Sequence, residues 1–494
     1  MTGKTYLAFD LGAESGRAVL GRFDGRRFAL EEIHRFPNGP VRVIDALHWD
    51  ALGLFNEIKK ALTLVGRQRS ETLSGLAVDT WGVDLALVGP NDVLLGNPYH
   101  YRDARFDGML DRTFRRVSRE EIFQVTGLQF MQFNTLFQLV RMVDERHPAL
   151  LSAERMLHMP DLFAWLMTGR QASEYTIAST SQMLDARTRQ WARPLLERLG
   201  IPTAILPEIL QPGTVIGPMV GWLAEETGLG KTPVIATACH DTGAAVASVP
   251  AEPKGDPWCY ISSGTWSLMG VELEAPRITP LALKYNFTNE GGVAGTIRFL
   301  KNIAGLWLVQ QCRAAWQLEG HDLSYDDLTK LAAGAPPFAA LIDPDDPSFI
   351  GIGQMPQRIA DYCRRTGQTP PDSQGGLVRC ILESLALRYR QVLDRLEETT
   401  DRPIRVIHIV GGGTRNRLLS QLTADATGRP VVAGPVEATA LGNVMMQAIA
   451  AGQLSSVWSG RQALRDSFPL ETFAPSQTPG WDEARKRFAE LTAG

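Results

Sequence analysis

The sequence has few of the features that mark several common protein classes. It contains 5 cysteines in 494 residues and no Cys-x-x-Cys pair, which fits neither a zinc site nor a disulfide scaffold. We therefore expect reduced thiols, although Cys363 and Cys380 are near enough in sequence to pair if their geometry allows it. The sequence also lacks a Gly-Lys-Ser/Thr step after its first glycine turn, so that turn is not a Walker loop.

Charge of one sign and long apolar runs are absent as well. Lys and Arg number 50 against 54 Asp and Glu, and a formal net charge of −4 is too balanced for a nucleic-acid or membrane-surface protein. No apolar segment near the N-terminus predicts a secretory signal. Residues 438–460 lack charge, but their Asn, Gln, Ser and Gly residues disfavour a membrane span. We expect a cytoplasmic protein, a monomer or small homo-oligomer, whose partners are small molecules.

The length and the residue patterns predict two α/β domains. A chain of 494 residues exceeds the size of one hydrophobic core, so two domains of roughly 250 residues each are expected. Three prolines in Val249–Pro257 interrupt both helix and strand, which predicts domains at residues 1–248 and 249–494. Hydrophobic periodicity predicts strands at 6–9, 18–23, 28–35, 75–79, 234–238 and 405–410, and helices at 51–65, 242–248 and along 377–396.

The segment Tyr6–Asp24 is the most informative part of the chain. An apolar strand ends on Asp10, turns through Gly12 and Gly16, and returns as a second strand. Small residues let backbone N–H groups approach a phosphate, and a carboxylate at a strand end suits Mg²⁺. An ordinary β-hairpin with an Asp in its turn would show the same pattern. Alone, the segment favours neither interpretation.

Two further glycine turns lie in the second half of the sequence. Ser263-Gly264-Thr265 follows a strand, and Gly411-Gly-Gly413 follows another. Three consecutive glycines fit a flat adenine or ribose lying against the backbone, and they equally fit a tight strand-to-helix turn. Each cluster is weak evidence by itself. The ordered set of three turns, spread over both halves, indicates a nucleotide-binding protein.

Asp241 is the candidate catalytic base. It stands between a predicted strand and a predicted helix, where an Asp is commonly a helix N-cap. Phosphoryl transfer to a hydroxyl group benefits from a carboxylate that accepts the proton of the alcohol. The position suits both roles.

Seven motifs in order along the chain carry a resemblance to a known family. They are Asp10-Leu-Gly-Ala, Val78-Asp-Thr-Trp-Gly-Val-Asp84, His240-Asp-Thr242, Ser262-Ser-Gly-Thr-Trp-Ser267, Lys301-Asn-Ile-Ala-Gly-Leu-Trp307, Val410-Gly-Gly-Gly413 and Glu437-Ala-Thr-Ala-Leu-Gly-Asn443. Together they resemble the FGGY carbohydrate kinases, over about residues 6–473. The resemblance implies two actin-like (ribonuclease-H-like) domains, each with a five-stranded mixed sheet, and a central nucleotide and sugar cleft.

The resemblance also implies site residues and an activity. It implies ATP contacts from Ala13, Glu14, Ser15, Gly16, Arg17, Thr265, Gln310 and Gly413. It implies sugar contacts from Gly82, His240, Asp241, Thr242 and Asn302, with Asp241 as the proton acceptor and Mg²⁺ near Asp10. Glu14 departs from the usual small hydroxyl residue of the first turn. The implied reaction is ATP-dependent phosphorylation of L-rhamnulose at its C1 hydroxyl.

Two alternatives stay open from the sequence. The same fold acts on other ketoses or polyols, such as L-fuculose, ribulose, xylulose or glycerol, when a few pocket side chains differ. An actin-like ATPase or a sugar sensor would bind nucleotide without transferring phosphate to a sugar. The His240-Asp-Thr242 motif argues against that second alternative.

Overall fold

Two compact units make up the computed structural model, which describes residues 3–69, 71–351, 353–476 and 479–493. The first unit combines residues 1–250 with 272–299 and 438–468, and the second combines 251–271, 300–437 and 469–494. The two units are therefore discontinuous in sequence. The sequence domains 1–248 and 249–494 stay a prediction, and the first unit also takes two segments from the second half of the chain.

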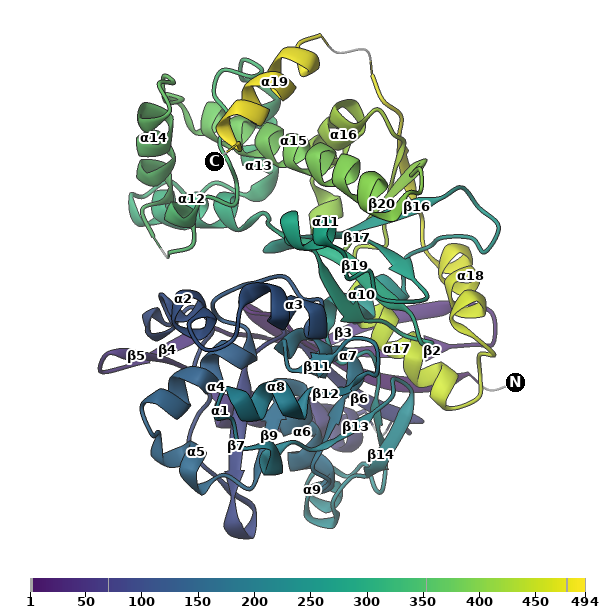
Figure 1. Cartoon of the computed structure of the whole chain (residues 1–494). Coiled ribbons are helices and arrows are strands. Elements are labelled where there is room, and N and C mark those ends of the chain that lie inside the picture. Colours follow the sequence, from purple (N-terminus) through teal and green to yellow (C-terminus); the bar gives the residue numbers. More distant parts are fainter. Residues whose placement is uncertain (1–2, 70, 352, 477–478, 494) are drawn as a thin grey trace. The chain divides into compact units, whose positions relative to one another are not determined.

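A mixed sheet forms the centre of the first unit (Figure 1). Within the described residues it has six strands in the order β14-β15-β6-β1-β2-β3, where five were expected. These strands are β1 (Lys4–Leu11), β2 (Ser15–Phe23), β3 (Phe28–Pro37), β6 (Gly75–Thr80), β14 (Thr214–Pro218) and β15 (Pro233–Ala236). β1, β6 and β15 are parallel, whereas β2, β3 and β14 are antiparallel to their neighbours. The predicted α/β class is confirmed.

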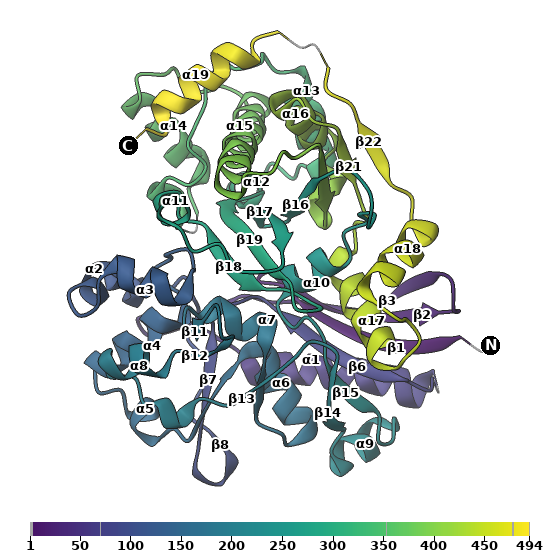
Figure 2. The same cartoon turned by 45° about the vertical axis from the view of Figure 1, so that its right-hand side comes forward.

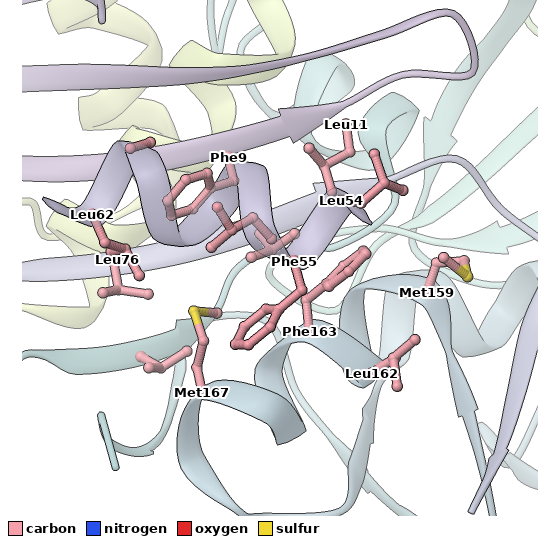
Figure 3. Close-up of a cluster of buried hydrophobic side chains, with 14 of the residues drawn as sticks. Phe9, Leu11, Leu54, Phe55, Leu62, Leu76, Met159, Leu162, Phe163 and Met167 are labelled. Carbon is pink, nitrogen blue, oxygen red and sulfur yellow. The ribbon is translucent and has the colours of Figure 1, made fainter. Parts of the chain in front are cut away.

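Both faces of this sheet are buried, because alternate side chains of β1 point to opposite sides. Leu7, Phe9 and Leu11 belong to one apolar cluster, and Tyr6 and Ala8 belong to another. The first cluster lies under α1 (Ala51–Thr63) and α6 (Met159–Thr168). Figure 3 shows Phe55 of α1 and Phe163 of α6 pointing toward one another beneath the strands.

The second cluster is covered by helices distant in sequence. They are α10 (Asp241–Ala247), α17 (Ala438–Ala450) and α18 (Val457–Ser467). An added Cβ at Gly442 of α17 would lie 1.8 Å from the carbonyl oxygen of Ala244, so only glycine lets α17 approach α10 this closely. The C-terminal part of the chain thereby completes the first unit.

Other elements of the first unit surround this core. They are β4 (Pro40–Val43), β5 (Ala46–Trp49), β7 (Leu85–Gly89), α2 (Met109–Phe114), α3 (Arg119–Thr126), α4 (Thr135–Asp144), β9 (Arg155–His158), β10 (Ala172–Glu174), α7 (Tyr175–Ala178), α8 (Arg193–Arg198), β13 (Glu208–Leu210), α9 (Gly221–Thr227), α11 (Pro280–Lys284) and β18 (Thr288–Gly291).

The second unit also has a sheet, with strands in the order β19-β17-β16-β20-β21-β22. These strands are β16 (Trp258–Ser263), β17 (Trp266–Leu273), β19 (Ile297–Ala304), β20 (Val406–Val410), β21 (Val431–Ala433) and β22 (Glu471–Phe473), of which residues 266–271 of β17 and 300–304 of β19 belong to this unit. β16, β20 and β21 are parallel.

Helices complete the second unit, and α15 packs along α16 (Figure 2). The helices are α12 (Trp307–Leu318), α13 (Tyr325–Gly334), α14 (Met355–Arg365), α15 (Gln374–Thr400), α16 (Arg417–Thr427) and α19 (Trp481–Leu491). The predicted helix along 377–396 is confirmed as part of α15. All five cysteines lie in the described residues, and all five are free and buried. None of the helices in the described part of the chain combines the length and apolar character needed to span a bilayer.

Candidate active site

Three carboxylates gather at the carboxyl ends of the parallel strands of the first unit. Asp10 near the end of β1 stands opposite Asp79 of β6 in the strand register. β15 runs parallel to β6, and the chain after it enters α10, whose first residue is Asp241. The carboxyl ends of parallel strands are the edge at which α/β folds bind ligands.

Burial and the nearby charge of Asp10 favour the protonated forms of Asp79 and Asp241. Burial raises the pKa of Asp79 well above its ordinary value, and the charge of Asp10 raises it further. Burial also raises the pKa of Asp241, and the charge of Asp10 raises it further. Perturbed carboxylates clustered at a sheet edge are typical of a functional site.

Asp10 and Asp79 each have a polar partner within the first unit. Arg17 donates to Oδ2 of Asp10 from Nε at 3.0 Å and from Nη2 at 2.7 Å. Asn443 of α17 donates from Nδ2 to Oδ2 of Asp79 at 2.6 Å. The sequence motif that contains Asn443 predicted no role for this residue. The structure shows that it hydrogen-bonds the most deeply buried of the three carboxylates.

The loop that carries Asp241 is held by a buried glutamate that the sequence analysis also missed. Glu174, at the end of β10, accepts hydrogen bonds from the backbone of Thr176, Ile177 and Cys239 at 2.8, 3.1 and 3.1 Å. The Thr176 hydroxyl donates to Glu174 and accepts from the backbone N–H of His240 at 3.1 Å. Burial raises the pKa of Glu174 to about 7. Glu174 therefore connects α7 to the backbone that leads into Asp241.

The predicted phosphate turn forms a tight hairpin between β1 and β2. The backbone N–H of Gly12 donates to the carbonyl of Ser15 at 3.0 Å. Ala13 and Ser15 are half-buried, and Glu14 is exposed. An added Cβ at Gly16 would lie 2.3 Å from the Phe36 ring, so packing alone requires glycine there. The ATP contacts assigned to residues 13–17 stay a prediction.

Gly82 lies in a strained loop directly after β6. Val83, a β-branched residue, has a φ of 72°, a conformation that persists only when its surroundings hold it. Thr180 provides part of this support, because its Oγ1 accepts from the Val83 backbone N–H at 3.2 Å. Asp84 accepts from the indoles of Trp49 and Trp81 at 2.6 and 2.9 Å. These contacts fix the backbone beside Gly82.

Thr265 and Gly413 lie in the second unit, in the turns that follow its parallel strands β16 and β20. Ser262 of β16 stands opposite Val410 of β20, so the turn through Thr265 and the turn through Gly413 are neighbours. An added Cβ at Gly413 would lie 2.0 Å from Oγ of Ser263. Gly411 has a φ of 90°, which favours glycine. The strand ends here carry glycines and hydroxyls in place of carboxylates.

Gln310 lies in a helix joined to one of these turns, and Asn302 lies in a strand of the same unit. The first turn of α12 is joined to the β16–β17 turn, because the backbone N–H of Trp307 donates to the carbonyl of Thr265 at 3.1 Å. Gln310 follows in α12, and among the described residues nothing hydrogen-bonds its buried Oε1. Asn302 lies in the part of β19 that belongs to the second unit, and its contact with the sugar stays a prediction.

Comparison with known proteins identifies the class of this chain. Residues 5–247 match the N-terminal domain of the FGGY family of carbohydrate kinases, and residues 259–451 match the C-terminal domain. The chain therefore belongs to the FGGY family and is a carbohydrate kinase.

Among curated proteins, rhamnulokinases are similar to this chain over almost its whole length. A rhamnulokinase of Bacteroides thetaiotaomicron is 47% identical over 485 residues, which cover 98% of this chain and 99% of the relative. A rhamnulokinase of Pectobacterium atrosepticum is 42% identical over 498 residues, covering 100% of this chain and 97% of the relative.

Solved structures confirm the fold. A xylulose kinase from Lactobacillus acidophilus has a TM-score of 0.79 at 16% identity, covering 99% of this chain and 97% of its own. A gluconate kinase from the same organism has a TM-score of 0.80 at 16% identity, covering 100% and 97%. The predicted actin-like α/β architecture is confirmed by this likeness.

Proposed function

We propose that the protein transfers the γ-phosphoryl group of ATP to the C1 hydroxyl of L-rhamnulose, giving L-rhamnulose 1-phosphate and ADP in L-rhamnose degradation. The identity to rhamnulokinases over nearly the whole chain, at 47% in one relative, is the observation that carries this proposal. The position of Asp241 at the carboxyl edge of the first sheet supports it, because the reaction needs a carboxylate there.

In this proposal Asp241 is the general base. Its carboxylate accepts the C1 hydroxyl proton as that oxygen bonds to the γ-phosphorus, and the bond from phosphorus to the ADP oxygen breaks. The raised pKa of Asp241 brings the group closer to working pH, where a base accepts a proton effectively. His240, Thr242, Gly82 and Asn302 contact the sugar.

In this proposal the second unit contributes neutral groups to the nucleotide site. Thr265 presents a hydroxyl and Gly413 a backbone without a side chain at neighbouring strand ends, and Gln310 offers its amide. Residues 13–17 contact the phosphates through the hairpin turn, where N–H groups and the Arg17 cation favour negative charge.

The first unit also fits a magnesium ion. Among the described residues, no group of three or more His, Cys, Asp or Glu is arranged to hold a metal. Mg²⁺ commonly keeps several waters and takes one or two carboxylates plus substrate phosphates, so it does not need such a group. Asp10 would hold it, and Oδ1 of Asp79, buried with no hydrogen bond from the described residues, fits a cation-bound water. When bound, Mg²⁺ offsets the negative charge of the phosphates.

A substrate panel tests the proposal. ADP release is measured with saturating ATP and L-rhamnulose, L-fuculose, ribulose, xylulose or glycerol, each with and without Mg²⁺. We expect kcat/KM for L-rhamnulose to exceed that for each other substrate by roughly 10-fold or more. A higher value for another ketose or polyol would reassign the sugar. ADP release that no sugar stimulates would refute the kinase reaction.

A further inference from the structure

Nδ1 of His240 faces a buried arginine that lies in none of the sequence motifs. Arg298, in β19, is fully buried within the first unit and donates from Nε to the carbonyl of Gly291 at 2.8 Å. Its Nη2 lies 3.0 Å from Nδ1 of His240, and its Nη1 lies 3.2 Å from Oε2 of Glu290. A buried cation needs such a counter-charge. Arg298 is therefore held in place by a carbonyl and a carboxylate while a third nitrogen faces the imidazole.

The hydrogen-bonding capacity of the guanidinium determines which nitrogen of the imidazole carries the proton. An arginine side chain carries donors only, so a hydrogen bond between Nη2 and Nδ1 makes Nδ1 the acceptor. A neutral imidazole whose Nδ1 accepts carries its proton on Nε2. Glu290 competes for the opposite arrangement, because its Oε2 lies 3.4 Å from the same Nδ1. The arginine contact is the shorter of the two and forms a hydrogen bond.

The other ring nitrogen faces the proposed base. Nε2 of His240 lies 3.4 Å from Oδ1 of Asp241. The same oxygen accepts from the backbone N–H of Thr242 at 2.5 Å and from the Thr242 hydroxyl at 3.3 Å. These contacts from the described residues converge on Oδ1, which leaves Oδ2 to face a substrate hydroxyl.

We propose that Arg298 is a positioning residue that holds His240 as the tautomer protonated on Nε2, so that this N–H and Thr242 fix Oδ1 of Asp241 and leave Oδ2 to accept the substrate proton. The role of Oδ2 rests on the proposed function. The tautomer of His240 does not, and it is tested independently of turnover.

Nitrogen NMR of the full-length protein labelled at histidine reads the tautomer directly. The chain has 8 histidines, and the spectrum of His240→Gln identifies the His240 signals by their disappearance. We expect Nδ1 to resonate as an unprotonated ring nitrogen and Nε2 as a protonated one. A proton on Nδ1 donated to Glu290, or protons on both nitrogens, would overturn the proposal.

Kinetics of two variants then test the positioning role. Arg298→Lys keeps a donor, and the double variant Glu290→Met with Arg298→Met removes both buried charges together, so that neither is left unpaired. We expect the double variant to lose the single-tautomer NMR signature and roughly 10–100-fold in kcat, while KM for ATP stays unchanged. Arg298→Lys should restore part of both.

The outcomes separate this proposal from the proposed function. An unchanged tautomer and an unchanged kcat in the folded double variant would refute the role of Arg298, even if L-rhamnulose proves to be the substrate. Conversely, an enzyme that prefers another sugar would leave the NMR result intact. If the double variant does not fold, the NMR spectrum of the unmodified protein and the kcat of Arg298→Lys still decide the matter.

Discussion

The carboxyl ends of the parallel strands differ in chemistry between the two units. In the first unit they carry Asp10 and Asp79, and Asp241 follows the third parallel strand. In the second unit the equivalent positions carry Ser263 and the glycines that follow Val410. The strand geometry is similar in the two units, but one edge presents negative charge and the other presents backbone and hydroxyl groups. In the proposed function, the first edge handles the proton and the cation, and the second edge binds the anionic nucleotide.

The edge of the first sheet with Asp10, Asp79 and Asp241 is called the acidic edge below. The largest effect should follow replacement of Asp241, its proposed base. We expect Asp241→Asn to fold and to bind ATP with unchanged affinity, but to lose roughly 10²–10⁴-fold in kcat, because the amide accepts no proton. ADP release and ATP titration measure the two quantities. Asp111→Asn, at an exposed position of α2, is the matched control and should behave as the unmodified protein. Near-normal turnover of Asp241→Asn would remove the distinction between the two edges.

The pH dependence of kcat sharpens the same comparison. Asp241 works as a base only when ionised, so kcat should fall about tenfold for each pH unit below its pKa. Because burial raises that pKa, the decline should begin at a higher pH than the ordinary value of an aspartate allows. Initial rates at saturating ATP and sugar between acidic and neutral pH measure it. The same acid limb in Asp241→Asn would assign the ionisation to another group.

The strand ends of the second unit that carry the glycines after Val410 are called the glycine edge below. They can be altered without changing any charged group. Gly413→Ala would force a Cβ to within 2.0 Å of Oγ of Ser263, so we expect a loss of about 1–3 kcal/mol in the free energy of unfolding and a higher KM for ATP. Urea unfolding and ATP kinetics measure these effects.

Gly412→Ala is the matched control for the glycine edge. Among the described residues, apart from its two chain neighbours, no atom lies within 4 Å of its added Cβ, and the free energy of unfolding of this variant should change by less than about 0.5 kcal/mol. If Gly412→Ala raises KM for ATP at unchanged stability, the turn contacts the nucleotide directly. If neither variant affects KM, the glycine edge is not a nucleotide site.

The smallest effect concerns the support behind Asp241. Glu174→Gln replaces a carboxylate oxygen that accepts backbone hydrogen bonds by an amide donor, which should lower the free energy of unfolding by about 1–2 kcal/mol. The pKa of this group is about 7 in the folded protein against an ordinary 4.5, so the folded state binds more protons between these values. Its contribution to stability therefore falls as pH rises from 4.5 to 7.

Chemical unfolding at several pH values measures this difference between the unmodified protein and Glu174→Gln. The stability advantage of the unmodified protein should shrink toward pH 7. Glu120→Gln, exposed in the first turn of α3, provides the control with no such trend. An advantage that grows with pH would show that Glu174 is ionised in the fold at all these values.

Sequence patterns predicted those parts of the site that lie close to their own strand or turn. Asp10 and Asp241 were found because each stands next to a strand with a clear apolar pattern, and the structure places both at the same sheet edge. The helix expected at 51–65 forms as α1 and ends in a π-helical turn at Leu64–Gln68. Local propensity and burial were sufficient for these features.

Long-range partners could not be predicted in this way. Asn443 reaches Asp79 across 364 positions of the sequence, and Arg298 reaches His240 across 58. A polar residue in a helix or strand looks the same in sequence whether it faces solvent or a buried carboxylate. The role of Glu174 could not be predicted for the same reason. The discontinuity of the two units could not be predicted either, because a break in composition marks a linker and does not show which later segments pack on an earlier core.

The close approach of α17 to α10 at Gly442 has a consequence for how the protein is made. During synthesis the sheet that carries Asp10 and Asp79 emerges long before residues 438–468, which cover its second face. Until then Tyr6, Phe23 and Phe28 lack their apolar cover, and Asp79 lacks its amide partner. The carboxylates at this sheet edge therefore reach their final arrangement only after residues 438–468 have been synthesised.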